Sequence, residues 1–256
     1  MNQVCDLNID SKIVKEIAKA YSTLDYVPKL RNLLKLVYPE KKTNKFCKLD
    51  LHKEINNLLL NSYEGEPILK YKLFKAFVNR DVVAAYEIKV KNSRVDFLTV
   101  DDVTTSFEIK SNLDNLTKLS KQSSDYVSAF DFNNIVIHER HLNKCLEIVP
   151  KSFGIITVDQ DGYEIVRKPT FNKSTDPSEQ LNLLTKKELL KNFGTIDTDD
   201  ILTSLDNIEI NKIFKLALKE RYKVRWNFIV KNSANILPID LQFFFKTNVE
   251  PALIYN

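Results

Sequence analysis

Glu108 and Lys110 lie two residues apart in the short segment Thr-Thr-Ser-Phe-Glu-Ile-Lys, whose β-branched and aromatic residues predict a strand. Because side chains alternate between the two faces of a strand, both charged groups share one face. Asp96 lies twelve residues earlier in a second segment of this kind, and a short polar connection predicts a hairpin that brings its carboxylate close to that of Glu108. Two neighbouring carboxylates repel each other, and a hard divalent cation keeps both ionised. The spacing therefore predicts Asp96 and Glu108 as ligands of Mg²⁺ or Mn²⁺.

Such a set of residues is suited to the hydrolysis of phosphodiester bonds. A bound cation polarises the phosphoryl group and acidifies a water molecule, and a nearby ammonium stabilises negative charge or orients that water. We assign this last role to Lys110. The acidic-x-Lys pattern alone is not specific, because it occurs at Asp10/Lys12, Glu40/Lys42, Glu87/Lys89 and Glu108/Lys110. The first two lie at expected helix boundaries, and Glu87/Lys89 lacks an aspartate on a paired strand.

The period of the apolar residues predicts the elements that position these side chains. Residues 1–80 have helical spacing, and residues 82–90, 94–100 and 104–110 predict three consecutive strands. A helix over 112–130 and a buried strand at 134–138 predict a crossover connection, followed by a hairpin at 153–158 and 163–166. A polar stretch, 170–183, predicts a linker before a helical region, 184–256. We expect an α/β fold of mixed α+β type, with a core over 81–169 and helical regions at both ends.

These motifs together resemble the core of PD-(D/E)xK nuclease-like proteins. The resemblance rests on Glu87, Ser-Arg-Val-Asp96, Phe-Glu108-Ile-Lys110-Ser, and a helix with Asp114, Gln122 and Tyr126. It is closest to uncharacterised bacterial members in which Arg-x-Asp precedes Glu-Ile-Lys and Gln-x-x-x-Tyr follows. It covers about residues 85–168 and, more weakly, 221–248. The proline that often precedes the aspartate is absent here.

The resemblance implies a restriction-endonuclease-like core, in which helices flank a mixed four-stranded sheet, and dependence on Mg²⁺. It also implies that Glu87 is an auxiliary acid, that Gln122 lines the site and that Ile109 is a further metal ligand. DNA is the expected partner, with Arg94, Lys118 and Tyr126 as candidate contacts. An excess of six positive charges over residues 1–80 would help to hold phosphates, although solvated lysine-rich helices have the same composition.

Two weaker patterns have structural explanations that compete with functional ones. His138, His141 and Cys145 have spacing compatible with zinc, but no fourth ligand is evident, and a strand end followed by a polar loop explains them better. A basic and aromatic group near residues 212–226 is compatible with nucleic-acid binding and equally with an amphipathic helix whose lysines face water.

The composition excludes several classes of protein. Four glycines leave no glycine-rich loop for a nucleotide, and three scattered cysteines form no disulfide framework. No apolar run reaches the length of a membrane span, and the first residues lack a signal peptide, so we expect a cytoplasmic protein with no membrane partner. Two alternatives to an enzyme remain, a catalytically inactive nucleic-acid- or protein-binding module that keeps the fold and a helical interaction protein. A homodimer also remains open.

Overall fold

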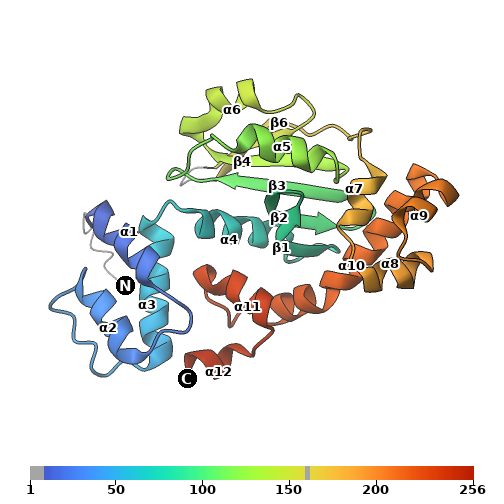
Figure 1. Ribbon diagram of the computed structural model, residues 1–256. Helices are drawn as coiled ribbons and strands as arrows, with labels where there is room; N and C mark the ends of the chain where they lie inside the picture. Colours follow the sequence, from blue (N-terminus) through green and yellow to red (C-terminus); the bar gives the residue numbers. More distant parts are fainter. Residues whose placement is uncertain (1–8, 159–161) are drawn as a thin grey trace.

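A six-stranded mixed sheet forms the centre of the protein (Figure 1). The computed structural model describes residues 9–158 and 162–256. The strands follow one another across the sheet in chain order, and they are β1 (Val83–Val90), β2 (Ser93–Val100), β3 (Thr104–Lys110), β4 (Phe132–His138), β5 (Gly154–Val158) and β6 (Tyr163–Arg167). The pairs β1/β2, β2/β3 and β5/β6 are antiparallel, whereas β3/β4 and β4/β5 are parallel. The predicted mixed α/β fold is confirmed, but the sheet has two strands more than the resemblance implied.

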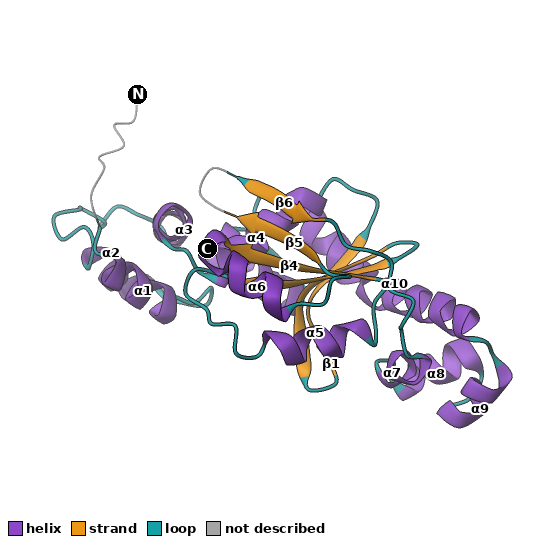
Figure 2. Ribbon diagram, turned by 90° about the horizontal axis from the view of Figure 1, so that it is seen from above, coloured by secondary structure: helices purple, strands orange, loops and turns teal. Residues whose placement is uncertain are grey.

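The described part of the chain also contains twelve α-helices. They are α1 (Ser11–Ala20), α2 (Val27–Lys35), α3 (Lys48–Ser62), α4 (Glu66–Phe77), α5 (Leu119–Val127), α6 (Leu142–Ile148), α7 (Pro177–Asn182), α8 (Lys186–Phe193), α9 (Thr198–Ser204), α10 (Asn207–Lys231), α11 (Leu241–Thr247) and α12 (Pro251–Tyr255). Figures 1 and 2 place α5 on one side of the sheet and α4 with α10 on the other. None of these helices has the length and apolar character needed to cross a membrane.

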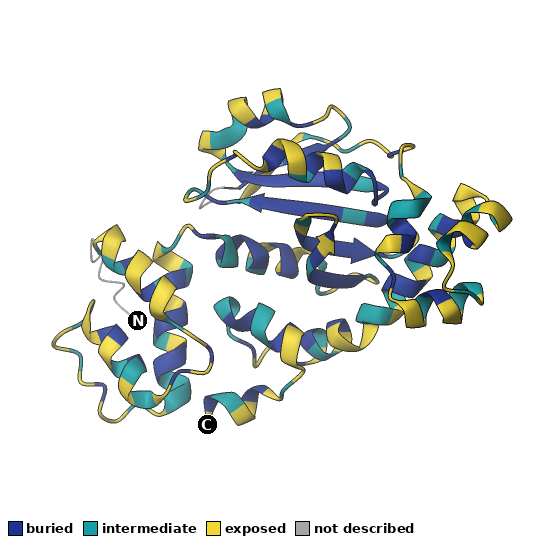
Figure 3. Ribbon diagram, in the orientation of Figure 1, coloured by how far each residue is buried: buried dark blue, intermediate teal, exposed yellow. Residues whose placement is uncertain are grey.

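An aromatic row holds α4 and α10 against the sheet. Tyr86 and Phe97 lie on neighbouring strands with ring centroids 5.0 Å apart, and Phe97 and Phe107 are 6.0 Å apart. Phe77 of α4 packs edge-on against Phe107 at 5.5 Å, and Trp226 of α10 packs against Phe97 at 6.3 Å. Such pairs stabilise by about 0.5–1.5 kcal/mol beyond the area they bury. The buried positions run along the strands and the facing sides of these helices (Figure 3). This core fixes α4 beside β1, β2 and β3.

The packing of the helices differs from the predicted division of the chain at two places. α4 belongs to the same hydrophobic core as the sheet, whereas the predicted helical region extended to residue 80 because the sequence period changes only there. Residues 170–183 are not a free linker. Within them Gln180 and Leu181 are fully buried in α7, and the Asn172 side chain donates to the carbonyl oxygens of Val127 and Phe130 at 2.6 and 2.9 Å.

The helices α1 to α3 form a second, smaller core that includes Val14, Leu30 and Leu51. A polar cluster joins this helical unit to the C-terminal helices. Asp240, 1% exposed, accepts hydrogen bonds from the hydroxyls of Thr23 and Tyr255, each at 2.7 Å, and from that of Tyr21 at 3.0 Å. The Tyr21 hydroxyl also lies 2.8 Å from Nδ1 of His52. We call Tyr21, Thr23, His52, Asp240 and Tyr255 the Asp240 cluster.

His52 makes the stability of this junction depend on pH. Burial lowers the pKa of His52 to about 4, below its ordinary value of 6.5, and its Nε2 has no hydrogen-bond partner among the described residues. A histidine whose pKa is lower in the folded state stabilises the fold above the unfolded pKa and loses that contribution as the pH falls. Between pH 7 and pH 5 we expect a loss of about 2 kcal/mol in the free energy of unfolding from this group.

Urea titrations across that range would measure this loss. His52→Phe, which keeps a ring between Tyr21 and Tyr255, should flatten the pH dependence, whereas His138→Gln should leave it as in the wild type. An equal pH dependence in wild type and His52→Phe would show that His52 is not the group responsible.

Candidate functional site

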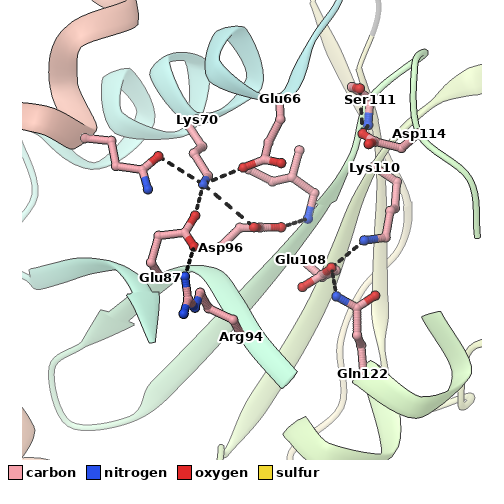
Figure 4. Close-up of polar contacts among 12 residues, drawn as sticks. Glu66, Lys70, Glu87, Arg94, Asp96, Glu108, Lys110, Ser111, Asp114 and Gln122 are labelled. Atoms are coloured by element: carbon pink, nitrogen blue, oxygen red, sulfur yellow. Dashed lines mark hydrogen bonds and ion pairs between the residues drawn. The ribbon is translucent and has the colours of Figure 1, made fainter. Parts of the chain in front are cut away.

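Three acidic residues occupy neighbouring positions on β1, β2 and β3. Tyr86 pairs with Phe97, and Phe97 pairs with Phe107, so the next positions of the register are Glu87, Asp96 and Glu108. The hairpin prediction therefore correctly brought Asp96 and Glu108 onto adjoining antiparallel strands. Figure 4 shows these three residues together with their contacts, and we call them the acidic row.

Asp96 lies where β2 and β3 diverge. The pairing of these strands ends at Phe97 and Phe107, and beyond it Oδ2 of Asp96 accepts the Ile109 N–H at 2.7 Å. The side chain thus takes the place of a strand-to-strand hydrogen bond, which holds a carboxylate that is only 9% exposed. At this fork Asp96 faces residues of α4 through Oδ1 and lies close to Glu108 (Figure 4).

Glu87 has a backbone conformation that is costly for a residue with a side chain. Its φ is 60°, in the left-handed region, and it falls between the paired residues Tyr86 and Ile88 in the middle of β1. This conformation costs roughly 1–2 kcal/mol in a non-glycine residue and persists where surrounding contacts enforce it. Here the Glu87 carboxylate contacts Lys70 and lies 3.5 Å from Arg94.

A lysine from α4 lies among three carboxylates on one side of the acidic row. Nζ of Lys70 is 2.5 Å from Oε1 of Glu66, forms an ion pair with Glu87 and lies 3.7 Å from Oδ1 of Asp96. It also donates to Oε1 of Gln242 at 3.3 Å. Lys70 is only 3% exposed. The ligand atoms of Glu66, Glu87 and Asp96 lie within 4.8 Å of one another, the one such acidic group of three found in the described residues.

Donors from β3 and α5 hold Glu108 in place. Nζ of Lys110 lies 2.5 Å from Oε1, the Gln122 amide donates to the same oxygen, and the Tyr126 hydroxyl lies 2.5 Å from Oε2. The same hydroxyl is 2.8 Å from the carbonyl oxygen of Arg94, and its single proton can serve only one acceptor at a time. Glu87, Gln122 and Lys110 thus lie around Asp96 and Glu108, and their roles in catalysis stay predictions.

The electrostatics of Asp96 and Glu108 favour binding of a positive charge. Burial raises the pKa of Asp96, and the nearby charges of Glu108 and Glu66 raise it further. Burial raises the pKa of Glu108 too, although its hydrogen-bond donors favour the ionised form. Burial opposes the charge of Lys110, but the carboxylates of Glu108 and Asp96 outweigh it and leave the pKa of Lys110 raised. Lys110 is therefore a cation at neutral pH, and the carboxylates carry unfavourable charge.

Counting acceptor sites tests whether a metal fits beside these residues. Two carboxylate oxygens offer about four lone pairs, of which Glu108 uses three, whereas Asp96 uses one in its bond to Ile109. Oxygen donors of this kind are those that Mg²⁺ and Mn²⁺ prefer. Oε1 of Gln122 is moreover a buried acceptor without a hydrogen-bond donor among the described residues. Water molecules bound to a cation would supply such a donor. A cation therefore fits Asp96 and Glu108.

The three residues proposed to contact nucleic acid have different environments. Arg94 has a side chain that is 60% exposed, and Lys118 is exposed at the start of α5, so both are accessible. Tyr126 is fully buried with its hydroxyl turned to Glu108, so a direct contact with nucleic acid does not match its position. The resemblance named Tyr126 on a helix beside the site, but the sequence did not reveal how deeply its side chain is buried. Ile109 contributes its N–H to Asp96, and its role as a metal ligand stays a prediction.

Two other sequence patterns have structural roles. Within residues 9–158 and 162–256, His138, His141 and Cys145 do not converge as a group of possible metal ligands. Nδ1 of His138 accepts the Arg140 N–H, and Cys145 is fully buried. In the basic and aromatic stretch of α10, Trp226 is a core residue. Arg221 of the same stretch forms an ion pair with Glu188 at 2.5 Å.

The sequence analysis missed Glu66 and Lys70. Both lie on α4, four residues apart, and the helix continues through Leu73 and Phe77 toward the sheet. One pattern in the sequence could have revealed them. Glu66 and Lys70 have the same helical spacing as the apolar residues of α4, and charged residues are unusual on the buried side of a helix.

Comparisons with known proteins give a family but no chemistry. A family model described as "Bacteriophage P4 protein cII" matches residues 60–244, a stretch that includes every residue of the site. A solved structure, a protein of unknown function from Silicibacter pomeroyi, is similar at 20% identity with a TM-score of 0.32, covering 43% of this chain and 72% of that one. That likeness is too distant to define a shared fold. A comparison with curated proteins finds no match.

Proposed function

Since this chain belongs to the family described as Bacteriophage P4 protein cII, a description that names no reaction, we propose its function from the site: a divalent-metal-dependent nuclease that hydrolyses phosphodiester bonds, with DNA as substrate. The observation that carries the proposal is the position of Asp96. It is buried at the fork between β2 and β3, has spare acceptor sites, and lies beside Glu108 and its partner Lys110.

The residues of the site have separate roles in the proposed reaction. Asp96 and Glu108 would hold Mg²⁺ or Mn²⁺, which supplies polarisation of the phosphoryl group and acidification of water when bound. Lys110, fixed by its bond to Glu108, stabilises negative charge that develops on the phosphate. Gln122 and Tyr126 hold the Glu108 carboxylate in the orientation needed to bind the metal and to contact Lys110. Arg94 and Lys118 are exposed near this set and would contact the phosphate backbone.

Removal and return of the metal tests this function directly. We expect linear and circular DNA, single- and double-stranded, to be cut with Mg²⁺ or Mn²⁺, left intact with chelator, and cut again once metal is restored in excess. Gel assays on the full chain measure this, and RNA of the same sequence tests the choice of substrate. Absence of cleavage of DNA and RNA under all these conditions, together with no metal-dependent rise in melting temperature, would remove the proposed function.

One observation favours a second candidate, an inactive nucleic-acid- or protein-binding module with the same fold. The ammonium of Lys70 already neutralises part of the acidic group formed by Glu66, Glu87 and Asp96. A chain that needs no metal for stability could keep such a lysine. DNA binding at low salt that persists in chelator, without cleavage in metal, would favour this candidate.

A further inference from the structure

We propose that Lys70 is a tethered cation, whose ammonium occupies a position that a divalent metal would otherwise take among Glu66, Glu87 and Asp96. Removal of its charge should therefore create an additional metal site in this protein. The inference builds on the proposed metal centre of Asp96 and Glu108 but concerns the opposite side of Asp96.

The geometry around Nζ of Lys70 is that of a bound cation. Four oxygens face it, one each from Glu66, Glu87, Asp96 and Gln242, and the three carboxylates come from three different elements, α4, β1 and β2. Their ligand atoms lie within 4.8 Å of one another, close enough to meet on one ion. Figure 4 shows the Lys70 ammonium between them. Hard oxygen ligands converging from several elements are what Mg²⁺ and Mn²⁺ require.

The burial of Lys70 makes this position more than a surface ion pair. Lys70 is only 3% exposed, so carboxylate oxygens of Glu66, Glu87 and Asp96 compensate the charge of its ammonium in place of water. Three carboxylates this close repel one another strongly unless a cation lies among them. Lys70 therefore supplies the charge that keeps the group together.

The backbone of Glu87 indicates that this arrangement is enforced. Its left-handed conformation directs a carboxylate to Lys70 from the middle of a strand, where an ordinary conformation would cost less. Glu66 and Lys70 are in addition one helical turn apart on α4, so the helix presents ligand and cation together.

Counting bound Mn²⁺ on the full chain tests the inference. Lys70→Met keeps the length of the side chain and removes its charge, and we expect it to bind one more Mn²⁺ per chain than the wild type by calorimetry and electron paramagnetic resonance. Adding Glu66→Gln to Lys70→Met should remove the extra ion, because one ligand charge is lost. Lys75→Met, at an exposed position of the same helix, should bind as the wild type does.

The counts separate this inference from the proposed nuclease. One bound ion in the wild type and two in Lys70→Met support both the proposed nuclease and the tethered cation. No ion in the wild type and one in Lys70→Met support the tethered cation and count against the metal centre at Asp96 and Glu108. Equal counts in wild type and Lys70→Met overturn the tethered cation. If Lys70→Met does not fold without metal, refolding in Mn²⁺ decides: recovery with Mn²⁺ supports the inference, and failure to recover overturns it.

Discussion

Replacement of Lys110 by methionine is expected to lower the rate of DNA cleavage by about 10²- to 10³-fold, the usual effect of removing one group that stabilises charge in a transition state. Methionine keeps the apolar stem of a side chain that is only 13% exposed, so the change is mainly one of charge. Glu108 keeps its bonds to Gln122 and Tyr126. Single-turnover rates at saturating Mg²⁺ measure the effect without a contribution from product release.

Lys89→Met provides a matched control for this variant. Lys89 follows Glu87 at the same acidic-x-Lys spacing on β1, but β2 separates that strand from β3, and the Lys89 side chain is exposed. We expect its cleavage rate to match that of the wild type. If Lys110→Met retains more than about a tenth of the wild-type rate, the role in charge stabilisation is wrong.

Asp96→Asn is expected to have opposite effects on function and on stability. Cleavage should fall by at least about 10³-fold, at the upper end for loss of one electrostatic group, and the metal-dependent rise in melting temperature should disappear. Without metal, the variant should melt at a higher temperature than the wild type. The pKa of Asp96 is raised, which means that its ionised form is disfavoured in the fold, and the neutral amide removes that cost while it can still accept the Ile109 N–H.

Thermal unfolding with chelator and with Mn²⁺ measures both effects in one experiment. Asp81→Asn is the control, because this substitution removes the same charge from the chain at an exposed position just before β1. A lower melting temperature of Asp96→Asn in chelator would indicate that Lys70 stabilises the carboxylate more than burial and Glu108 oppose it.

The local part of the site could be predicted from the sequence. Alternation along two short segments and a two-residue polar connection were enough to place Asp96 beside Glu108 and to put Lys110 on the same face as Glu108. The resemblance named Gln122 and Tyr126 on the following helix, and both side chains donate to Glu108. These relations depend on the geometry of adjacent elements, which a repeating pattern specifies.

Contacts between distant elements could not be predicted in this way. Lys70 and Gln242 are 172 residues apart and meet only because α4 and α11 both pack against the sheet. Burial of Tyr126 and of Gln180 depends on how neighbouring segments cover them, which composition does not reveal. The left-handed Glu87 has no sequence signal either, because glutamate rarely adopts that conformation.

The Asp240 cluster limits how this protein can be divided for experiments. A shortened chain that starts at residue 60 would retain the stretch matched by the family but would lose Tyr21, Thr23 and His52. In the full chain the Asp240 carboxylate is 1% exposed, and in the fragment Tyr255 would be the one side chain of the cluster still donating to it. A buried charge without enough hydrogen-bond donors is costly. In such a fragment we therefore expect water to reach the Asp240 carboxylate or α11 to pack less firmly. Because α11 carries Gln242, which accepts a hydrogen bond from Lys70, deletion of a unit remote from the acidic row would be felt at the row itself.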